Sequence, residues 1–379
     1  MIKHLICQEC PNGCNLLIAW SDALRVTVSG NQCSRGIGYA GRILNRGQKV
    51  HVAARDKTPA FSTETLRDIV LAWGITLKKP RYDIGVQGSP ERSVFRVAVE
   101  DTHQNLFVLE RIFLKTLTQK RNIAKTLELL AERKLKLVHP YRRSVQHGHV
   151  VKHKNGFWQL SDFVPGIPLD RANYMFERWR GSWLAEFLID LRRRSQDIPF
   201  VDAKKVFSLK DYIARLTRHA ALDRPDIIAR TAPVTDFLDK ELWPFYDKVP
   251  ASFCHGDYHP MNMIWGKKNI SAVIDWEFCG SKSEIYDMAN LIGCVGVEDP
   301  RALEGELVSG FIETIQSSRM ISWQGFRCLG AFIVALRFAW LSEWLRRNDA
   351  EMIDLELEYL RVLIEKQPIF KETWIAGRR

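Results

Sequence analysis

The chain lacks an uninterrupted apolar stretch long enough to cross a lipid bilayer. Its most apolar later segment, residues 332–344, contains Arg337 and Glu343, whereas a membrane-spanning helix needs about 20 predominantly apolar residues. The N-terminus lacks the apolar core of a secretory signal peptide, because cysteines interrupt its first 15 residues. We therefore expect a cytoplasmic protein without a membrane partner.

Internal repeats, low-complexity tracts and a basic-aromatic module of the nucleic-acid-binding kind are also missing. We therefore expect no nucleic-acid partner. The formal charge of +11 favours small anions such as ATP, although solvated Lys and Arg side chains account for most of the excess. With 379 residues, of which 46% are hydrophobic, the chain is long enough for two or three well-packed lobes.

Patterns of strand and helix divide the chain into four parts. Residues 1–45 form a cysteine-rich module, residues 46–80 a connector with one helix, residues 81–165 a β-rich lobe, and residues 166–379 a mostly helical lobe. This order predicts an α+β protein with two lobes behind a small N-terminal module. The expected elements are strands at 16–19 and 24–28, a helix at 62–73 that stops at Gly74, a hairpin of strands 94–99 and 106–112, a helix at 120–134, a strand at 157–164, and strands at 263–265 and 271–274.

Residues 255–277 carry the most informative motif. The run His-Gly-Asp-Tyr-His-Pro-Met-Asn places Asn262 five residues after Asp257, and the apolar run Ala-Val-Ile ends at Asp275. Phosphoryl transfer in a kinase-type site needs one carboxylate beside the acceptor hydroxyl and two oxygen ligands that hold Mg2+ against the triphosphate of ATP. We therefore interpret the chain as an ATP- and Mg2+-dependent phosphotransferase.

The expected roles follow from charge. Asp257 is the catalytic residue, which orients the acceptor hydroxyl and takes its proton late. Asn262 and Asp275 are the Mg2+ ligands, because a hard cation prefers oxygen. The metal neutralises charge that develops on the phosphoryl oxygens. His255 and His259 are expected to shape the loop through hydrogen bonds.

Joined to His-Gly before it and Ile-Asp-Trp after it, this spacing resembles the aminoglycoside phosphotransferase and choline kinase family. That family is the small-molecule branch of the protein-kinase-like fold. The resemblance covers residues 81–360 and implies a β-rich N-lobe, a helical C-lobe and ATP between them. It implies a small-molecule hydroxyl as acceptor, with homoserine, sugar, amino alcohol and nucleoside acceptors all open. Asp287, in Tyr-Asp-Met-Ala, resembles the family residue that braces the catalytic loop.

The nucleotide-binding residues follow the family pattern less closely. Gly88 and Ser89 lie in a turn before the hairpin and would cover the phosphates with backbone N–H groups. The kinase pattern expects a Lys on the second hairpin strand, but Glu110 stands at that position. Arg111 is the candidate phosphate ligand, with Lys152 as an alternative.

Residues 159–166 resemble the hinge that links the two lobes. The resemblance implies that backbone groups around Asp162 and Val164 pair with the adenine edge. Glu128, on the helix at 120–134, is a plausible partner for a phosphate-binding cation, and a solvated surface Glu explains it equally well. Glu277 has two interpretations, a hydrogen bond within its loop or an approach to the metal.

Four cysteines near the N-terminus predict a second metal site. Cys7, Cys10 and Cys14 form C-x2-C-x3-C, and Cys33 follows. Such a set binds an iron–sulfur cluster or Zn2+. The first three resemble the entry motif of the iron–sulfur domain in molybdopterin oxidoreductases. The whole stretch more closely resembles an uncharacterised four-cysteine module found near flavin-dependent oxidoreductases, which implies an oxidoreductase partner. The spacing favours a cluster, with zinc as the alternative.

Two other interpretations stay open. A protein kinase would carry His-Arg-Asp and Ala-Pro-Glu elements, which are missing here. A redox-sensing or scaffold protein with an inactive kinase-like fold is favoured by Glu110. The intact set of Asp257, Asn262 and Asp275 argues against it.

Overall fold

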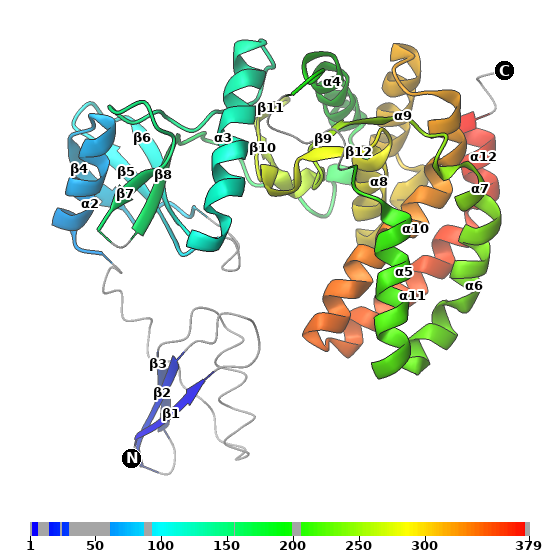
Figure 1. Ribbon diagram of the computed structural model, residues 1–379, viewed down its shortest axis with the longest axis horizontal. Coiled ribbons are helices and arrows are strands. Elements are labelled where there is room, and N and C mark those ends of the chain that lie inside the picture. The colour runs from blue at the N-terminus through cyan, green and yellow to red at the C-terminus, as the bar shows by residue number, and fades with distance from the viewer. Residues whose placement is uncertain are drawn as a thin grey trace. The chain divides into compact units, whose positions relative to one another are not determined.

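The computed structural model describes residues 2–6, 15–22, 25–29, 61–86, 93–154, 156–198 and 206–375. The chain divides into two compact units, each treated by itself below (Figure 1). One unit contains the described parts of Met1–Lys115 with Arg143–Leu160, and the other contains Thr116–Arg142 with Ser161–Arg379. The predicted cysteine ligands and the two predicted phosphate-loop residues lie outside the described residues: Cys7, Cys10, Cys14, Cys33, Gly88 and Ser89.

The first unit contains two antiparallel sheets. A three-stranded sheet has the order β1-β2-β3, with β1 at Ile2–Ile6, β2 at Asn15–Asp22 and β3 at Arg25–Ser29. The predicted strand at 16–19 falls within β2, and the predicted strand at 24–28 overlaps β3 at residues 25–28, whereas β1 was not predicted.

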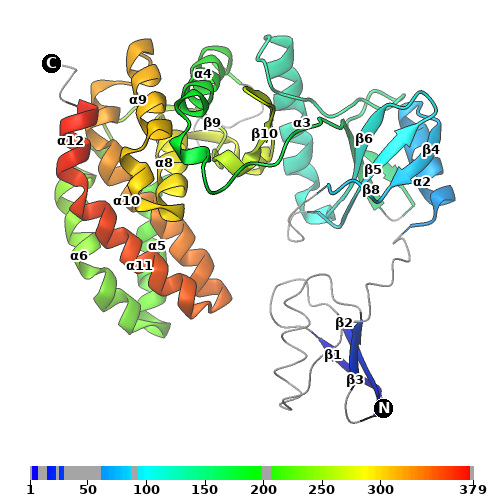
Figure 2. The same ribbon diagram turned by 180° about the vertical axis from the view of Figure 1, so that it is seen from behind.

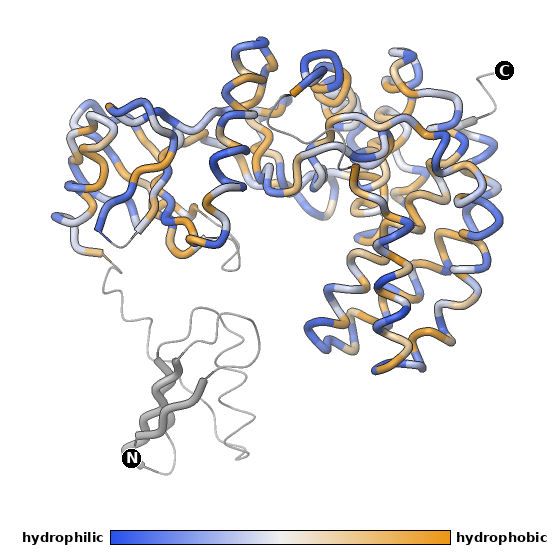
Figure 3. Tube along the Cα trace, in the orientation of Figure 1, coloured by the Kyte–Doolittle hydropathy of each residue, from blue (hydrophilic) through white to orange (hydrophobic). Residues whose placement is uncertain are grey.

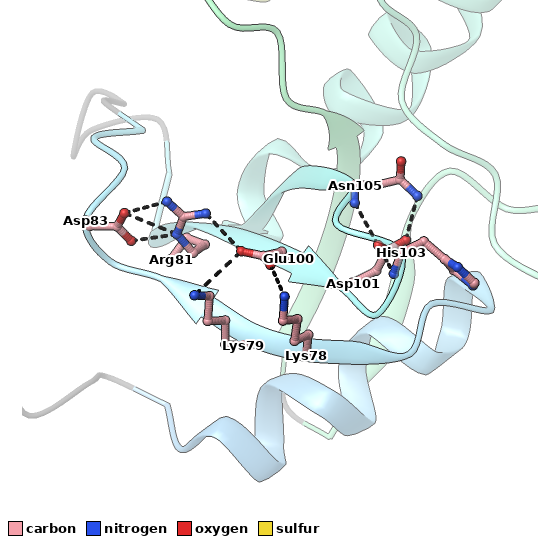
Figure 4. A network of polar contacts seen from close by, with 8 residues as sticks. All are labelled: Lys78, Lys79, Arg81, Asp83, Glu100, Asp101, His103 and Asn105. Carbon is pink, nitrogen blue, oxygen red and sulfur yellow. Dashed lines mark hydrogen bonds and ion pairs between the residues drawn. The ribbon is translucent and has the colours of Figure 1, made fainter.

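A five-stranded sheet with the order β4-β5-β6-β8-β7 forms the body of this unit. Its second and third strands are the predicted hairpin, and Asp101 closes its turn by accepting 2.8 Å hydrogen bonds from the backbone N–H groups of His103 and Asn105 (Figure 4). The strands are β4 Leu77–Arg81, β5 Phe95–Asp101, β6 Leu106–Ile112, β7 Val151–His153 and β8 Gly156–Asp162.

Helix α2, Thr63–Val70, covers one face of the five-stranded sheet (Figures 1 and 2). The Ser62 hydroxyl caps it by accepting a 3.1 Å hydrogen bond from the backbone N–H of Thr65. A 3-10 turn continues it to Gly74, whose φ of +69° ends the helix where the sequence predicts. The helix buries apolar side chains against one alternating set of strand residues: Leu66, Ile69 and Val70 against Leu77, Val97, Val99, Phe107, Leu109, Trp158 and Leu160.

The second unit is mostly helical, and apolar and polar stretches alternate along its helices (Figure 3). Two small antiparallel sheets, β9–β12 and β10–β11, interrupt the helices at the motif of residues 255–277. The strands are β9 Ala251–Cys254, β10 Met263–Trp265, β11 Ile270–Val273 and β12 Gly280–Ser283. The helices are α3 Leu117–Glu132, α4 Arg178–Arg194, α5 Leu209–Asp223, α6 Pro225–Glu241, α7 Trp243–Tyr246, α8 Tyr286–Glu298, α9 Glu306–Ser318, α10 Trp323–Arg347, α11 Ala350–Glu365 and α12 Gln367–Ile375.

Helix α10 is the one described helix that is long and apolar enough to cross a membrane by length and composition. Within the protein, 61% of its most apolar window is buried, as in the core helix of a globular domain. Arg337 of α10 and Glu356 of α11, both buried, form an ion pair with two 2.6 Å contacts. The charge of Arg337, one of the two charged residues that interrupt this apolar segment, is therefore neutralised by Glu356 inside the core.

Candidate active site

Asp287 holds the first part of the loop that follows β9. Its carboxylate accepts hydrogen bonds of 2.7 Å from the backbone N–H of His255 and 2.8 Å from that of Gly256. Burial raises the pKa of Asp287 to about 6, while these two hydrogen bonds oppose the rise. The expectation that Asp287 braces the loop is confirmed by these contacts.

The backbone conformation and packing of the loop require glycine at position 256. Its φ is +85°, and a Cβ at this position would overlap the backbone carbonyl oxygen of Phe278. Glycine is therefore required twice, once by the left-handed backbone and once by the close approach of the neighbouring chain. This requirement explains the glycine between His255 and Asp257 in the motif.

His255 is fully buried and ties the loop to the segment that leads to Asp275. Its Nε2 lies 3.0 Å from the carbonyl oxygen of Ile274, and its Nδ1 accepts a 3.2 Å hydrogen bond from the backbone N–H of Asp257. An accepting Nδ1 leaves the proton on Nε2, which donates to Ile274. Burial lowers the pKa of His255 to about 4, so the ring is neutral near pH 7. The structural role predicted for His255 is confirmed.

His259 shapes the other half of the loop. Its Nδ1 accepts a 3.3 Å hydrogen bond from the backbone N–H of Met261, and its Nε2 lies 3.6 Å from a carboxylate oxygen of Asp257. Both side chains keep 16% of their surface exposed. His259 therefore orders the loop and also lies beside the predicted catalytic carboxylate.

Asn262 and Asp275 meet at one end of the β10–β11 pair. The backbone N–H of Ile274 donates a 2.9 Å hydrogen bond to the carbonyl of Asn262, directly beyond the pairing of Met263 with Val273. The side-chain amide of Asn262 donates a 2.8 Å hydrogen bond to the carbonyl of Asp257, which leaves its oxygen available as an acceptor. The sequence predicted both strands and so this meeting point.

This donor set suits Mg2+. A neutral amide oxygen and a carboxylate are oxygen ligands, and Mg2+ is typically held by one or two carboxylates together with phosphates and water. Among the residues with described side chains, no group of three or more His, Cys, Asp and Glu could hold a metal. A cation at Asn262 and Asp275 would therefore take its other ligands from phosphate and water.

Glu277 has a partner that neither sequence interpretation named. Its carboxylate forms an ion pair with Lys120 of α3, and its backbone carbonyl accepts a 2.7 Å hydrogen bond from the side chain of Gln119. The Lys120 side chain is completely buried. A usable signal existed in the sequence, because Lys120 precedes Ile123 and Leu127 at the helical spacing of a buried stripe.

In the first unit, Glu110 is buried and lies 3.1 Å from the guanidinium of Arg96. The guanidinium of Arg111 lies over two rings, 5.6 Å from the centroid of Phe61 and 6.0 Å from that of Trp158. Trp158 packs with α2, so Arg111 lies on the side of the sheet that α2 covers. Its role as a phosphate ligand stays a prediction.

The two predicted hinge residues, Asp162 and Val164, lie at the end of β8 and just after it, and a third residue of β8 was not predicted. Asp162 ends β8 and lies 2.6 Å from the guanidinium of Arg142, with both side chains about half exposed. Val164 follows the strand and is partly buried. Gln159, on β8, is fully buried, and within the described structure its amide nitrogen and oxygen have no hydrogen-bond partner. Sequence reasoning missed this buried polar group.

Acidic side chains of residues 349–358 take part in structural contacts. Glu356 is buried with Arg337, the Asp349 side chain caps α11, and Asp354 lies 2.7 Å from Arg230. The basic residues Arg192 and Arg194 likewise pair, with Glu284 at 2.7 Å and Asp190 at 2.8 Å. These side chains therefore have structural partners of opposite charge or cap a helix.

The comparisons with known proteins agree with this arrangement. The Phosphotransferase enzyme family matches residues 90–320, which is more than half of the chain. The chain belongs to this family. The match includes the catalytic loop, α3 and the hinge segment and begins after the N-terminal cysteines. No curated protein sequence matches the chain.

Solved structures share the fold of this family member at low sequence identity. An aminoglycoside phosphotransferase from Alicyclobacillus acidocaldarius is 14% identical with a TM-score of 0.60, covering 85% of this chain and 97% of its own. An amicoumacin kinase in complex with AMP-PNP, Ca2+ and Ami is 13% identical with a TM-score of 0.60, covering 82% and 96%. A microcompartment-associated aminopropanol kinase is 14% identical with a TM-score of 0.57, covering 82% and 99%. The neighbours are small-molecule kinases, and the structural similarity to them shows the kinase-like fold of the chain.

Proposed function

We propose that this protein transfers the γ-phosphate of ATP to a hydroxyl group of a small molecule in a Mg2+-dependent reaction. The observation that carries the proposal is the joining of two segments by hydrogen bonds. His255 and Asn262 of the loop both bond to the backbone of Ile274, next to Asp275. These hydrogen bonds tie Asp257, Asn262 and the residue before Asp275 together within the second unit, which supports the proposed roles.

In the proposed reaction, Asp257 accepts a hydrogen bond from the acceptor hydroxyl and aims its oxygen at the γ-phosphorus. The new oxygen–phosphorus bond forms as the bond to the bridging oxygen of ADP breaks, and the hydroxyl proton passes to Asp257. Asn262 and Asp275 would hold Mg2+, which neutralises charge on the phosphoryl oxygens when bound. The hydrogen bond from Asn262 to the Asp257 carbonyl fixes the spacing between acceptor and metal residues.

The nucleotide contacts are part of the same proposal. Backbone groups at Asp162 and Val164 would pair with the adenine edge, and Gly88, Ser89 and Arg111 would contact the phosphates. The fold shared with the amicoumacin kinase, which is described with a nucleotide analogue and a divalent cation, supports this assignment. A cytoplasmic location fits the use of ATP.

The decisive experiment is an acceptor screen that measures ADP release with Mg2+ and a panel of sugars, amino alcohols, homoserine and nucleosides. Thermal unfolding with ATP, with and without Mg2+, is measured in parallel. We expect a Mg2+-dependent rise in the unfolding temperature and ADP release with at least one class of hydroxyl. ATP binding that is indifferent to Mg2+, with no acceptor, would instead favour an inactive kinase-like fold, which the acidic Glu110 suggests.

The N-terminal cysteines are proposed to bind an iron–sulfur cluster or Zn2+ and to connect the kinase with an oxidoreductase partner. The support is the C-x2-C-x3-C spacing with Cys33. Metal analysis of protein purified without air tests the assignment. Iron and sulfide would identify a cluster, zinc would identify the alternative, and protein without either metal would refute both.

A further inference from the structure

Lys120 is an unusual residue for the inside of a protein. Its side chain is completely buried on α3, and a buried ammonium is strongly unfavourable unless a carboxylate compensates it. Glu277, whose side chain is 12% exposed, supplies that carboxylate. Gln119, the preceding residue of α3, adds a 2.7 Å hydrogen bond to the Glu277 carbonyl. The first turn of α3 thus contacts both the side chain and the backbone of Glu277.

The attached residue lies directly beyond a proposed Mg2+ ligand. Asp275 has a φ of +65°, and Glu277 belongs to the 3-10 turn that follows. A non-glycine residue with a left-handed backbone is strained and keeps this conformation only when its surroundings hold it. Before Asp275, the carbonyl of Ile274 is held by His255. After it, Glu277 is held by α3.

The chain that leaves α3 is attached to the same region. The carbonyl of Leu137 accepts a 2.9 Å hydrogen bond from the backbone N–H of Val273, and the His139 ring lies 3.2 Å from the carbonyl of Ser271. Strand β11 and the turn after Asp275 are therefore both anchored to α3 and its extension. A displacement of Glu277 relative to α3 would act on Asp275 first, since β11 is anchored separately.

The ion pairs of this chain differ from the pair that kinases use. In kinases, a strand Lys pairs with a helix Glu. Here the strand carries Glu110, which lies 3.1 Å from Arg96, and the helix carries the cation. The cation of α3 pairs with Glu277, two residues after the proposed metal ligand Asp275.

We propose that Lys120 is a positioning residue for Mg2+. Through Glu277 it holds Asp275 in its ligand conformation, so that the affinity for Mg2+ depends on the ion pair. This inference rests on the proposed function, because it needs Asp275 to be a metal ligand. It adds a residue of α3 that does not touch substrate or metal.

The test is a Mg2+ titration of the unfolding temperature at a fixed ATP concentration, which requires no acceptor. Lys120→Met should raise the Mg2+ concentration at the half-maximal shift by roughly 10- to 100-fold, the usual loss when a residue that orients a metal ligand is removed. The matched control is Arg121→Met, which removes the same charge from an exposed position of the same helix. It should stay within twofold of the parent protein.

Two further variants keep the test valid if Lys120→Met fails to fold. Glu277→Gln removes the pair from the other side, and the double variant leaves no uncompensated buried charge. Because both residues act through one contact, the double variant should lose no more Mg2+ affinity than either single one. At saturating Mg2+, all three should recover most of the ATP-dependent shift.

The outcomes separate this inference from the proposed function. The inference would be overturned if Lys120→Met and the double variant required a Mg2+ concentration within twofold of that of the parent for the half-maximal shift, while Asp275→Asn abolished the Mg2+ response. The proposed function would then still stand. A parent protein without any Mg2+-dependent ATP shift would overturn the proposed function itself.

Discussion

The carboxylate of Asp287 accepts a 2.8 Å hydrogen bond from the backbone N–H of Gly256. Asp287 lies in the first turn of α8, and Gly256 lies between the end of β9 and Asp257. One contact therefore joins the helical core to the residue that precedes the proposed catalytic carboxylate. The loop is thus held in place by hydrogen bonds from the buried backbone N–H groups of His255 and Gly256.

Gly256→Ala should destabilise the protein by roughly 2 kcal/mol or more, because the new Cβ meets the carbonyl of Phe278 and the backbone has a φ of +85°. Urea unfolding measures the loss. Gly85→Ala is the matched control, since a Cβ there has no atom within 4 Å, and its stability should change by less than about 0.5 kcal/mol. Equal stability of the two variants would contradict this account of the loop.

Asp257→Asn should reduce the turnover number for phosphoryl transfer at least ~100-fold, because the amide cannot take the proton of the acceptor. The fold and the Mg2+-dependent ATP shift should be retained, since the substitution keeps the shape of the side chain. Asp236→Asn, at an exposed position of α6, is the control and should keep full activity. Near-normal turnover by Asp257→Asn would show that another residue orients the hydroxyl.

The pH dependence of stability should carry a contribution from His255. Burial lowers its pKa to about 4 in the folded chain, against about 6.5 when unfolded. The folded state therefore binds fewer protons between these values, so this contribution is full above about pH 6.5 and is lost as the pH falls through 4. Its size is roughly 3 kcal/mol.

Urea unfolding of the parent and of His255→Gln from pH 4 to 7 measures this contribution. The difference in unfolding free energy should shift in favour of the variant as the pH falls. Asp287 titrates in the same window with the opposite sign, since its folded pKa is raised to about 6, and the comparison between variants cancels it to first order. His219→Gln, exposed on α5, should leave the pH profile unchanged. A pH-independent difference for His255→Gln would refute the prediction.

Glu356→Gln should destabilise the protein by roughly 3–5 kcal/mol, because Arg337 would keep an uncompensated charge inside the core. Glu358→Gln on the same helix is the matched control. Its pair with Arg361 is exposed on both sides, so a loss below about 1 kcal/mol is expected. Thermal unfolding ranks the two variants, and similar losses would mean that the buried pair is not needed for stability.

Local patterns predicted much of the fold because their causes are local. Runs rich in strand-forming residues and the turn between two of them located β5, β6 and β8, and the capping Ser62 and Gly74 indicated the two ends of the helical segment that contains α2. The strands expected between Asn262 and Asp275 are present as the β10–β11 hairpin, and the site roles of Asp257, Asn262 and Asp275 stay a prediction. In these cases the partner lies close along the chain.

The features that were missed depend on partners far apart in sequence. The helical spacing of Lys120 with Ile123 and Leu127 indicates its burial, but no local rule identifies Glu277 as its partner. Glu356 stands in a run of acidic residues, and only the packing of α10 on α11 shows that it differs from Glu358. The unpartnered amide of Gln159 likewise becomes visible only when the strands are assembled.

Strand β4 forms one border of the five-stranded sheet and carries Lys78, Lys79, Pro80 and Arg81. The carboxylate of Glu100, on the neighbouring strand, forms ion pairs with Lys78 at 2.7 Å, Lys79 at 3.9 Å and Arg81 at 2.9 Å (Figure 4). Proline offers no N–H to an incoming strand, and a row of positive charges repels a second copy of itself. This border of the sheet is therefore a poor template for pairing with a further strand.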